Sequence, residues 1–266
     1  MLCFVACQGT TERVAGWYVT RKITQYLDLT SAQKDATRQD VDRTISVIRR
    51  TELSPWVSFL REVRQGIHDG LTDDLTAHLQ RRYDQRLDAG VDLLTPRLSA
   101  LLAQLNDAQV DHFTAKMHED VDRLYEDREQ PKGKQQRNFE KKALKLVEDF
   151  VGDLSDEQET QVRALIRRIP DERAKQYEAA QKNLHEFRAF MGRHPDAPTI
   201  EGELRSMWAH RYDALGRGRE MNVRRAEQRK WLIDVYRILD AKQRAHAEAE
   251  LTDRINMLKR WVLPAT

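Results

Sequence analysis

Leu29-Thr30-Ser31-Ala32-Gln33 is the first of four copies of one short motif from which the helical organisation can be predicted. The other copies are Leu105-Asn106-Asp107-Ala108-Gln109, Leu154-Ser155-Asp156-Glu157-Gln158 and Leu239-Asp240-Ala241-Lys242-Gln243. Each copy consists of a leucine, a small capping residue, two variable residues and a glutamine. A capping residue followed three positions later by glutamine is the capping box that begins an α-helix. The motif therefore predicts four helix starts.

Each motif position has its own expected role. The predicted N-caps, whose side chains accept from amides of the first turn, are Thr30, Asn106, Ser155 and Asp240. The glutamines that can reach back to the amide of the cap are Gln33, Gln109, Gln158 and Gln243. The leucine stands just outside the helix, and we expect it to pin the entering chain against the core. The position that would staple it is apolar only at Val110, so the sequence does not identify the other packing partners.

The spacing of the copies suggests a duplication. The first two glutamines are 76 residues apart and the last two are 85 apart. We predict a lipoprotein signal remnant, anchor and first helix in 1–28, a first helical half in 29–130, a connecting segment in 131–153 and a second half in 154–266. Two related halves would pack about a pseudo-twofold axis and frame a groove in a monomer.

Composition and periodicity both indicate an all-α fold of about seven or eight helices. Apolar residues recur every three or four positions, for example from Val110 to Leu124 and from Leu251 to Val262. Glycine and proline total 18 of 266 residues, which is too few for a barrel or sandwich with many tight turns. The longest such stripe runs from Leu75 to Leu105 and contains Pro96, where we expect a kink or a restart capped by Thr95.

Charge and cysteine content exclude several classes of protein. The formal net charge is +2, which gives no electrostatic case for nucleic acid as a partner. Two cysteines are too few for a disulfide scaffold or a cysteine-rich zinc module. No stretch of about 20 apolar residues is present, so the sequence predicts no membrane-spanning helix.

The first seven residues, Met-Leu-Cys-Phe-Val-Ala-Cys, end like a bacterial lipoprotein signal. The small residue Ala6 precedes Cys7, whose sulfur would receive the lipid. The basic start and longer apolar stretch of a complete signal are missing, so we expect a remnant. The residues alone leave open an ordinary N-terminal cysteine.

The motifs resemble those of the Spy/CpxP group of periplasmic stress proteins, which are all-helical. Spy is an ATP-independent chaperone with a cradle-shaped dimer. The chain also resembles a family of bacterial lipoproteins of undetermined function, through Cys7, Trp17-Tyr18, the stretch 26–33, Arg49 to Pro55, and Leu154 to Asp171. This resemblance implies a lipid on Cys7 and, with Gln8 after it, sorting to the outer membrane.

Searches for catalytic and metal-binding patterns give nothing. The chain has no Gly-x-Ser-x-Gly, no phosphate loop and no His-x-x-x-His pair among its eight histidines. We therefore predict no enzyme activity, no cofactor and no metal site.

Charge blocks and aromatic residues leave alternatives open. Lys132 to Lys145 holds six basic residues and one acidic, and Arg217 to Lys230 holds six and two. These stretches are either solvated faces with ion pairs or contacts for anionic headgroups or acidic clients. Trp56 and Phe59 are expected in the core, whereas Trp17 and Tyr18 belong either to the core or to a membrane interface.

The sequence thus predicts a non-catalytic lipoprotein of the Gram-negative periplasm, anchored by Cys7 and sorted to the outer membrane. We expect an ATP-independent, chaperone-like or stress-related protein that binds unfolded or envelope proteins. The alternative is a structural adaptor for one specific envelope protein. A third hypothesis, a metal-responsive sensor, finds almost no support in the residues.

Overall fold

The computed structural model of the protein describes residues 8–211 and 221–262. These residues form eleven α-helices, one 3-10 helix and no strand. The helices are α1 (Gln8–Leu27), α2 (Ser31–Thr51), α3 (Leu53–Asp69), α4 (Asp73–Leu102), α5 (Asp107–Leu124), η1 (Glu126–Glu129), α6 (Lys132–Val151), α7 (Asp156–Ile166), α8 (Arg173–Met191), α9 (Ala197–Ala209), α10 (Met221–Ile238) and α11 (Ala241–Val262). The all-α prediction is confirmed.

The predicted number of helices, seven or eight, is wrong, because the chain breaks more often than its stripes suggest. A single residue, Glu52, separates α2 from α3, and Pro55 sits in the first turn of α3. Proline lacks an amide hydrogen, so it suits a helix start and not a helix interior. Between α7 and α8, Pro170 lies in the connection itself, outside both helices.

Pro96 does not restart its helix. α4 runs through Pro96 for 30 residues, and Thr95 is buried inside it. The Thr95 hydroxyl donates to the carbonyl of Val91 at 2.7 Å, so it serves a bond within the helix and not a new cap.

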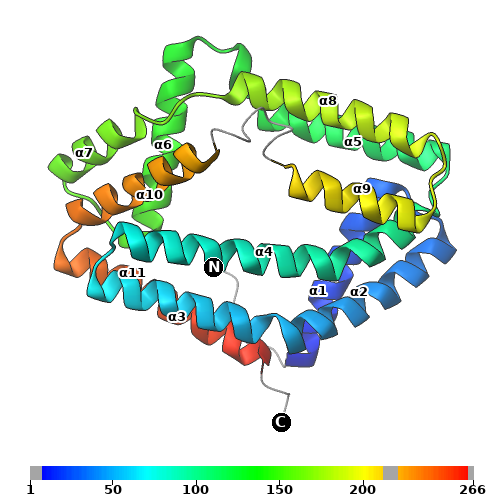
Figure 1. Ribbon diagram of the computed structural model, residues 1–266, viewed down its shortest axis with the longest axis horizontal. Coiled ribbons are helices and arrows are strands. Elements are labelled where there is room, and N and C mark those ends of the chain that lie inside the picture. Colours follow the sequence, from blue (N-terminus) through cyan, green and yellow to red (C-terminus); the bar gives the residue numbers. More distant parts are fainter. Residues whose placement is uncertain (1–7, 212–220, 263–266) are drawn as a thin grey trace.

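The helices form a frame that is longer than it is wide (Figure 1). α5 and α8 lie along one long side, and α3 and α4 lie along the other. One end is built from α1, α2 and α9, and the opposite end from α6, α7, α10 and α11. The closest packings across the chain are α3 on α11, α4 on α9 and α5 on α8.

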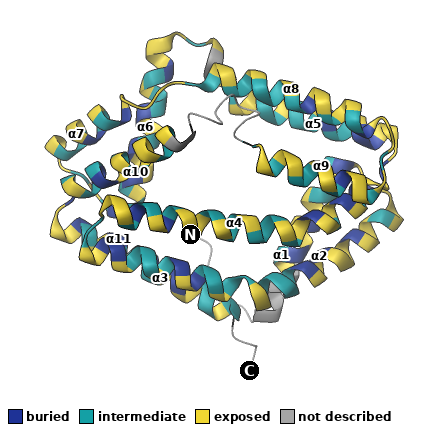
Figure 2. Cartoon of the chain, viewed as in Figure 1, coloured by how far each residue is buried: buried dark blue, intermediate teal, exposed yellow. Residues whose placement is uncertain are grey.

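Each end of the frame has its own apolar core, seen as dark blue positions where helices meet (Figure 2). The first core lies at the α1, α2 and α9 end, and its buried residues are Leu27, Leu29, Leu102, Leu105, Val110, Met191 and Ile200. The second core lies at the opposite end, and its most enclosed members are Val162, Ile166 and Ala247. The segment 131–153 contains helix α6, which supplies Leu144, Val147 and Val151 to this second core.

α4 connects the two ends through charged contacts. Arg225 of α10 donates to Asp84 at 2.8 Å, and Arg205 of α9 pairs with Asp92. Trp208 of α9 donates its indole N–H to Asp88 at 2.8 Å. In the stretch 217–230, the described residues Arg224, Arg225 and Arg229 all form ion pairs with carboxylates of other elements.

No helix within the described ranges is both long and apolar enough to cross a membrane.

Candidate functional site

The four motifs form four capping boxes at the starts of α2, α5, α7 and α11. In the first, the Gln33 amide donates to the Thr30 hydroxyl oxygen at 3.4 Å, and the Thr30 amide donates to Oε1 of Gln33 at 3.0 Å. Asn106 with Gln109, Ser155 with Gln158 and Asp240 with Gln243 repeat both bonds. Each box satisfies amides that a helix start would otherwise leave unpaired.

The glutamines of the first two motifs also bind each other. Nε2 of Gln109 donates to Oε1 of Gln33 at 2.8 Å, and Nε2 of Gln33 lies 3.3 Å from Oε1 of Gln109. Nε2 of Gln109 also donates to the backbone carbonyl of Asp28, and Nε2 of Gln33 donates to that of Gln104, both at 3.0 Å. Each of these carbonyls directly precedes the leucine of the other motif. We call this arrangement the first glutamine clasp, and it joins the α1–α2 corner to the α4–α5 corner.

The last two motifs form an equivalent second clasp. Gln158 and Gln243 exchange side-chain hydrogen bonds at 2.8 and 2.9 Å. Nε2 of Gln158 donates to the carbonyl of Ile238 at 3.0 Å, and Nε2 of Gln243 donates to that of Asp153 at 2.8 Å. These carbonyls again precede the motif leucines, so the α6–α7 corner is joined to the α10–α11 corner.

The motif leucines pack beneath the clasps. Leu29 and Leu105 are buried together in the first core. Leu239 is buried in the second core, and the partly buried Leu154 packs against it. Each motif thus supplies a helix cap, half of a clasp and a core residue, which makes its role structural.

An apolar pocket lies beside the first clasp, between α1, α4, α5, α8 and α9. Its volume is about 570 Å³, and only Lys22, Tyr26 and Asn183 among its lining residues are polar. The rings of Phe113 and Phe187 meet edge to face in its wall, with centroids 5.3 Å apart. Both rings pack against the first core, so the pocket is an unfilled extension of that core.

The mouth of the apolar pocket carries exposed large side chains. Leu98 of α4 is 43% exposed and Met207 of α9 is 41% exposed, although both line the pocket. A second hollow of about 440 Å³ between α8 and α9 shares four lining residues with it, namely Asn183, Phe187, Leu204 and Met207. The apolar surface therefore continues from one hollow into the next.

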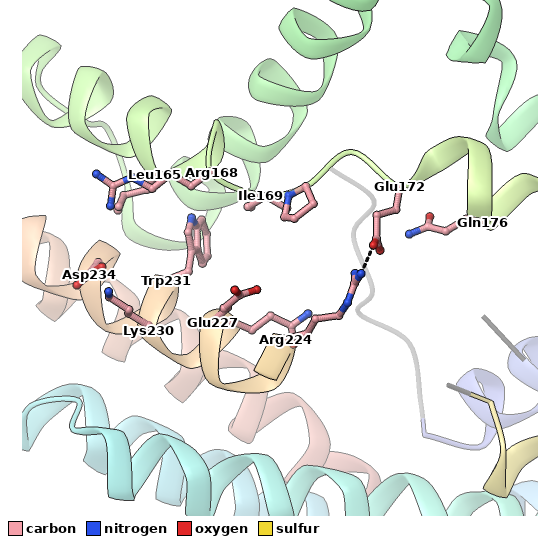
Figure 3. A pocket seen from close by; sticks show the side chains of 12 residues that line it. Leu165, Arg168, Ile169, Glu172, Gln176, Arg224, Glu227, Lys230, Trp231 and Asp234 are labelled. Atoms are coloured by element: carbon pink, nitrogen blue, oxygen red, sulfur yellow. Dashed lines mark hydrogen bonds and ion pairs between the residues drawn. The ribbon is translucent and has the colours of Figure 1, made fainter. Parts of the chain in front are cut away.

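A third pocket, drawn in Figure 3, lies where the α7–α8 connection faces α10. Its volume is about 450 Å³, and Trp231 points into it with an indole N–H that has no hydrogen-bond partner among the described residues. Arg224 bridges to Glu172 across it. Three cationic and three anionic side chains line this pocket, so it lacks the charge preference that would select a charged ligand.

A buried carboxylate of α6, that of Glu140, forms an ion pair with Arg167 at the end of α7. Glu140 is buried, and the guanidinium of Arg167 donates to its two oxygens at 3.0 and 3.1 Å. These bonds hold the pKa of Glu140 below its ordinary value, against the opposing effect of burial. A depressed pKa stabilises the fold above the unfolded pKa of about 4.3, and that stability is lost as the pH falls through the folded pKa.

We expect Glu140→Gln to lower the free energy of unfolding at pH 7 by about 1–2 kcal/mol, because two charge-assisted hydrogen bonds are weakened. The difference from the wild type should shrink between about pH 5 and pH 3, since Glu140 itself then takes up a proton. Urea unfolding of both proteins from pH 7 down through this pH range measures the difference in the free energy of unfolding. The exposed Glu178 of α8 is the control, and an equal effect of Glu178→Gln would contradict the assignment.

The predicted anchor, the histidines and the aromatic residues lie in different settings. Cys7 lies outside the described residues. His68, His78 and His194 lie beside single carboxylates, at 3.4 to 3.7 Å. No group of three or more potential metal ligands occurs in the part of the chain that the structure describes. Trp56 and Phe59 join Tyr83 in an aromatic cluster, whereas Trp17 and Tyr18 are exposed.

The apolar pocket and its continuation are the features that sequence reasoning did not find. Their lining comes from five helices that lie far apart in the chain. The apolar stripe from Val110 to Leu124 predicted the apolar face of α5, but no feature of the sequence indicated that part of this face would remain uncovered.

Comparison with protein families matches residues 25–215 to a family of unknown function, DUF6279. The match covers well over half of the chain, so the protein belongs to this family. Comparisons with curated proteins and with solved structures found no match.

Proposed function

We propose that this protein binds flexible or unfolded polypeptide segments in the apolar pocket and catalyses no reaction. The observation that carries the proposal is the pocket itself, an almost wholly apolar hollow of about 570 Å³ with large side chains exposed at its mouth. A large apolar hollow with few polar groups is the usual form of a binding site. Among the described residues that line the pocket, only Lys22 is charged, so apolar contact rather than a set of fixed charges would select the ligand.

The chemistry of the lining supports a range of clients more than a single one. Met117 and Met207 contribute unbranched thioether side chains, which adapt to differently shaped apolar groups. Binding proteins with many partners use such surfaces. The adjoining hollow between α8 and α9 would accommodate a segment longer than one side chain.

The site of action belongs to the same proposal. The N-terminal sequence supports a lipoprotein anchored through Cys7 in the Gram-negative periplasm, with Gln8 favouring the outer membrane. An anchored binding protein would hold envelope proteins near the membrane during stress, in keeping with the motif resemblance to Spy/CpxP proteins.

We also propose that the two halves arose by duplication and act as one monomeric unit. Reciprocal packing supports this origin. α3, which lies between the first two motifs, packs on α11, which follows the fourth motif. α8, which lies between the last two motifs, packs on α5, which follows the second motif. Two glutamine clasps with the same hydrogen-bond pattern are a further sign of common descent.

The test is suppression of aggregation. A stoichiometric amount of the protein should suppress aggregation of two unrelated denatured proteins without ATP. The double variant Leu98→Ser/Met207→Ser should bind these clients about tenfold more weakly or worse, because burying each large apolar side chain contributes roughly 1.5–3 kcal/mol. Light scattering and client titration measure both effects.

The matched control is Leu124→Ser/Leu146→Ser, which removes two exposed large apolar side chains that do not line the apolar pocket. This control should keep full suppression. Equal loss in both double variants would contradict the pocket as the binding site. Suppression of neither client by the wild type would reject the chaperone-like function and favour the adaptor, which should crosslink stoichiometrically to one envelope protein.

A further inference from the structure

We infer that a basic pocket between α1 and α2 binds the phosphate group of an anionic phospholipid and seats this face of the protein on a membrane surface. The pocket has a volume of about 500 Å³. Its lining residues are Trp17, Thr20, Arg21, Thr24, Gln25, Lys34 and Arg38. The inference concerns a site of the folded chain and does not depend on a lipid at Cys7 or on the apolar pocket.

The charge of the basic pocket has one sign. Arg21, Lys34 and Arg38 are cationic, and no carboxylate lines the pocket. Within the described residues none of the three forms an ion pair. Elsewhere in this protein arginines commonly face carboxylates, as Arg82 faces Glu62 at 3.1 Å and Arg188 faces Asp111 at 2.7 Å. Three unneutralised cations around one hollow favour an anionic ligand.

Two threonines of the basic pocket carry unused hydrogen-bonding capacity. The hydroxyl oxygens of Thr20 and Thr24 are buried and have no hydrogen-bond partner among the described residues. Thr20 as a whole is only 4% exposed. A buried hydroxyl without a partner is unfavourable. A phosphate oxygen entering the pocket would supply the acceptor that such a hydroxyl lacks, next to the three cations.

The rim of the basic pocket identifies the source of the phosphate as a membrane. Trp17 and Tyr18 are 52% and 55% exposed, and the exposed Val14 lies one helical turn before them on the same face of α1. The Arg21 guanidinium lies 5.3 Å from the centre of the Trp17 ring. Tryptophan and tyrosine settle at membrane–water interfaces, and basic residues beside them attract anionic headgroups. Exposed aromatic side chains would contribute nothing to the binding of a free phosphate ion from water.

The position of α1 in the chain agrees with this orientation. α1 begins at Gln8, and the face that bears Val14, Trp17 and Arg21 lies on its first four turns. The basic pocket and the apolar pocket both use α1, but they share no lining residue. A contact of the basic pocket with a membrane therefore uses none of the residues that line the apolar pocket.

The test uses the full chain carrying Cys7→Ala, which cannot be acylated at that position, in flotation with vesicles. We expect binding to vesicles of phosphatidylcholine mixed with phosphatidylglycerol and little binding to phosphatidylcholine alone. Lys34→Ala/Arg38→Ala should weaken binding by about tenfold or more, since each basic residue near an anionic surface is attracted to it. Trp17 fluorescence should shift to shorter wavelength on binding, and Trp17→Ser should remove that part of the shift.

The matched control is Arg43→Ala/Lys182→Ala, which removes the same charge from exposed positions outside the basic pocket. It should change binding by less than about twofold, because the headgroup contact is local. Arg38→Lys, which keeps the charge, should retain most of the binding. Thermal melts of every variant verify that these exposed substitutions leave the fold intact.

Three results would overturn the inference. The first is equal binding to neutral and anionic vesicles, and the second is equal loss in the control and in Lys34→Ala/Arg38→Ala. The third is saturable binding of inorganic phosphate in calorimetry without any binding to anionic vesicles, which would assign the basic pocket to a soluble anion.

Discussion

Gln109→Ala is expected to lower the free energy of unfolding by about 3 kcal/mol. The Gln109 side chain is 4% exposed and takes part in the first clasp through bonds to Gln33, to the carbonyl of Asp28 and to the amide of Asn106. A satisfied hydrogen bond contributes about 1 kcal/mol net, and a buried partner left unpaired costs about 1–3 kcal/mol. Urea unfolding followed by circular dichroism measures the loss.

Gln104→Ala is the control for Gln109→Ala. The Gln104 side chain is exposed and donates only to the carbonyl of Ala100, in the last turn of α4, at 2.8 Å. Its removal should change stability by less than about 0.5 kcal/mol, while the Gln104 backbone carbonyl still accepts from Gln33.

A double-mutant cycle of Gln33→Ala with Gln109→Ala isolates the clasp itself. We expect a coupling free energy of about 0.5–3 kcal/mol, because the two side chains exchange hydrogen bonds directly. Strict additivity of the two substitutions would show that each glutamine acts only as a local helix cap, and it would contradict the clasp.

Ile166→Ala is expected to lower the free energy of unfolding by about 3–4 kcal/mol. Ile166 is completely buried in the second core, where helices from both halves of the chain meet. Truncation removes buried apolar surface and leaves a cavity that the neighbouring helices close only in part. Because α3 of the first half packs on α11 in this core, we expect one cooperative unfolding transition for the whole protein.

Ile169→Ala is the matched control for Ile166→Ala, with the same chemistry three residues later. Ile169 is 38% exposed, so its truncation should cost about 1 kcal/mol or less. Comparable losses for the two variants, or a second unfolding transition at the opposite end of the frame, would contradict a shared core.

The motifs show what sequence could predict and what it could not. The bond from the Thr30 amide to Gln33 spans three residues, so local chemistry was enough to predict it. Nε2 of the same Gln33 side chain bonds to the carbonyl of Gln104 and to Oε1 of Gln109, which are 71 and 76 residues away in the sequence. A capping box does not indicate which distant motif will supply the hydrogen-bond partner of its glutamine, because that partner depends on how the helix corners pack together.

The same distinction applies to the helices and the sites. The stripes of apolar residues predicted all-α structure, but a single residue such as Glu52 was enough to divide a stripe into two helices. The choice between core and surface for Trp17 was open in the sequence, since an aromatic helix face suits either. In the structure Trp17 is exposed beside Arg21, and the basic pocket can be recognised only from this placement.

The most direct test of polypeptide binding in the apolar pocket is site-specific photo-crosslinking. A photo-reactive phenylalanine replaces Leu98 at the pocket mouth in one sample and the exposed Leu146 of α6 in another. Each is irradiated with a denatured client protein in the absence of ATP. We predict a crosslink from position 98 and none from position 146. No crosslink from position 98, or equal crosslinking from both positions, would contradict the proposed site.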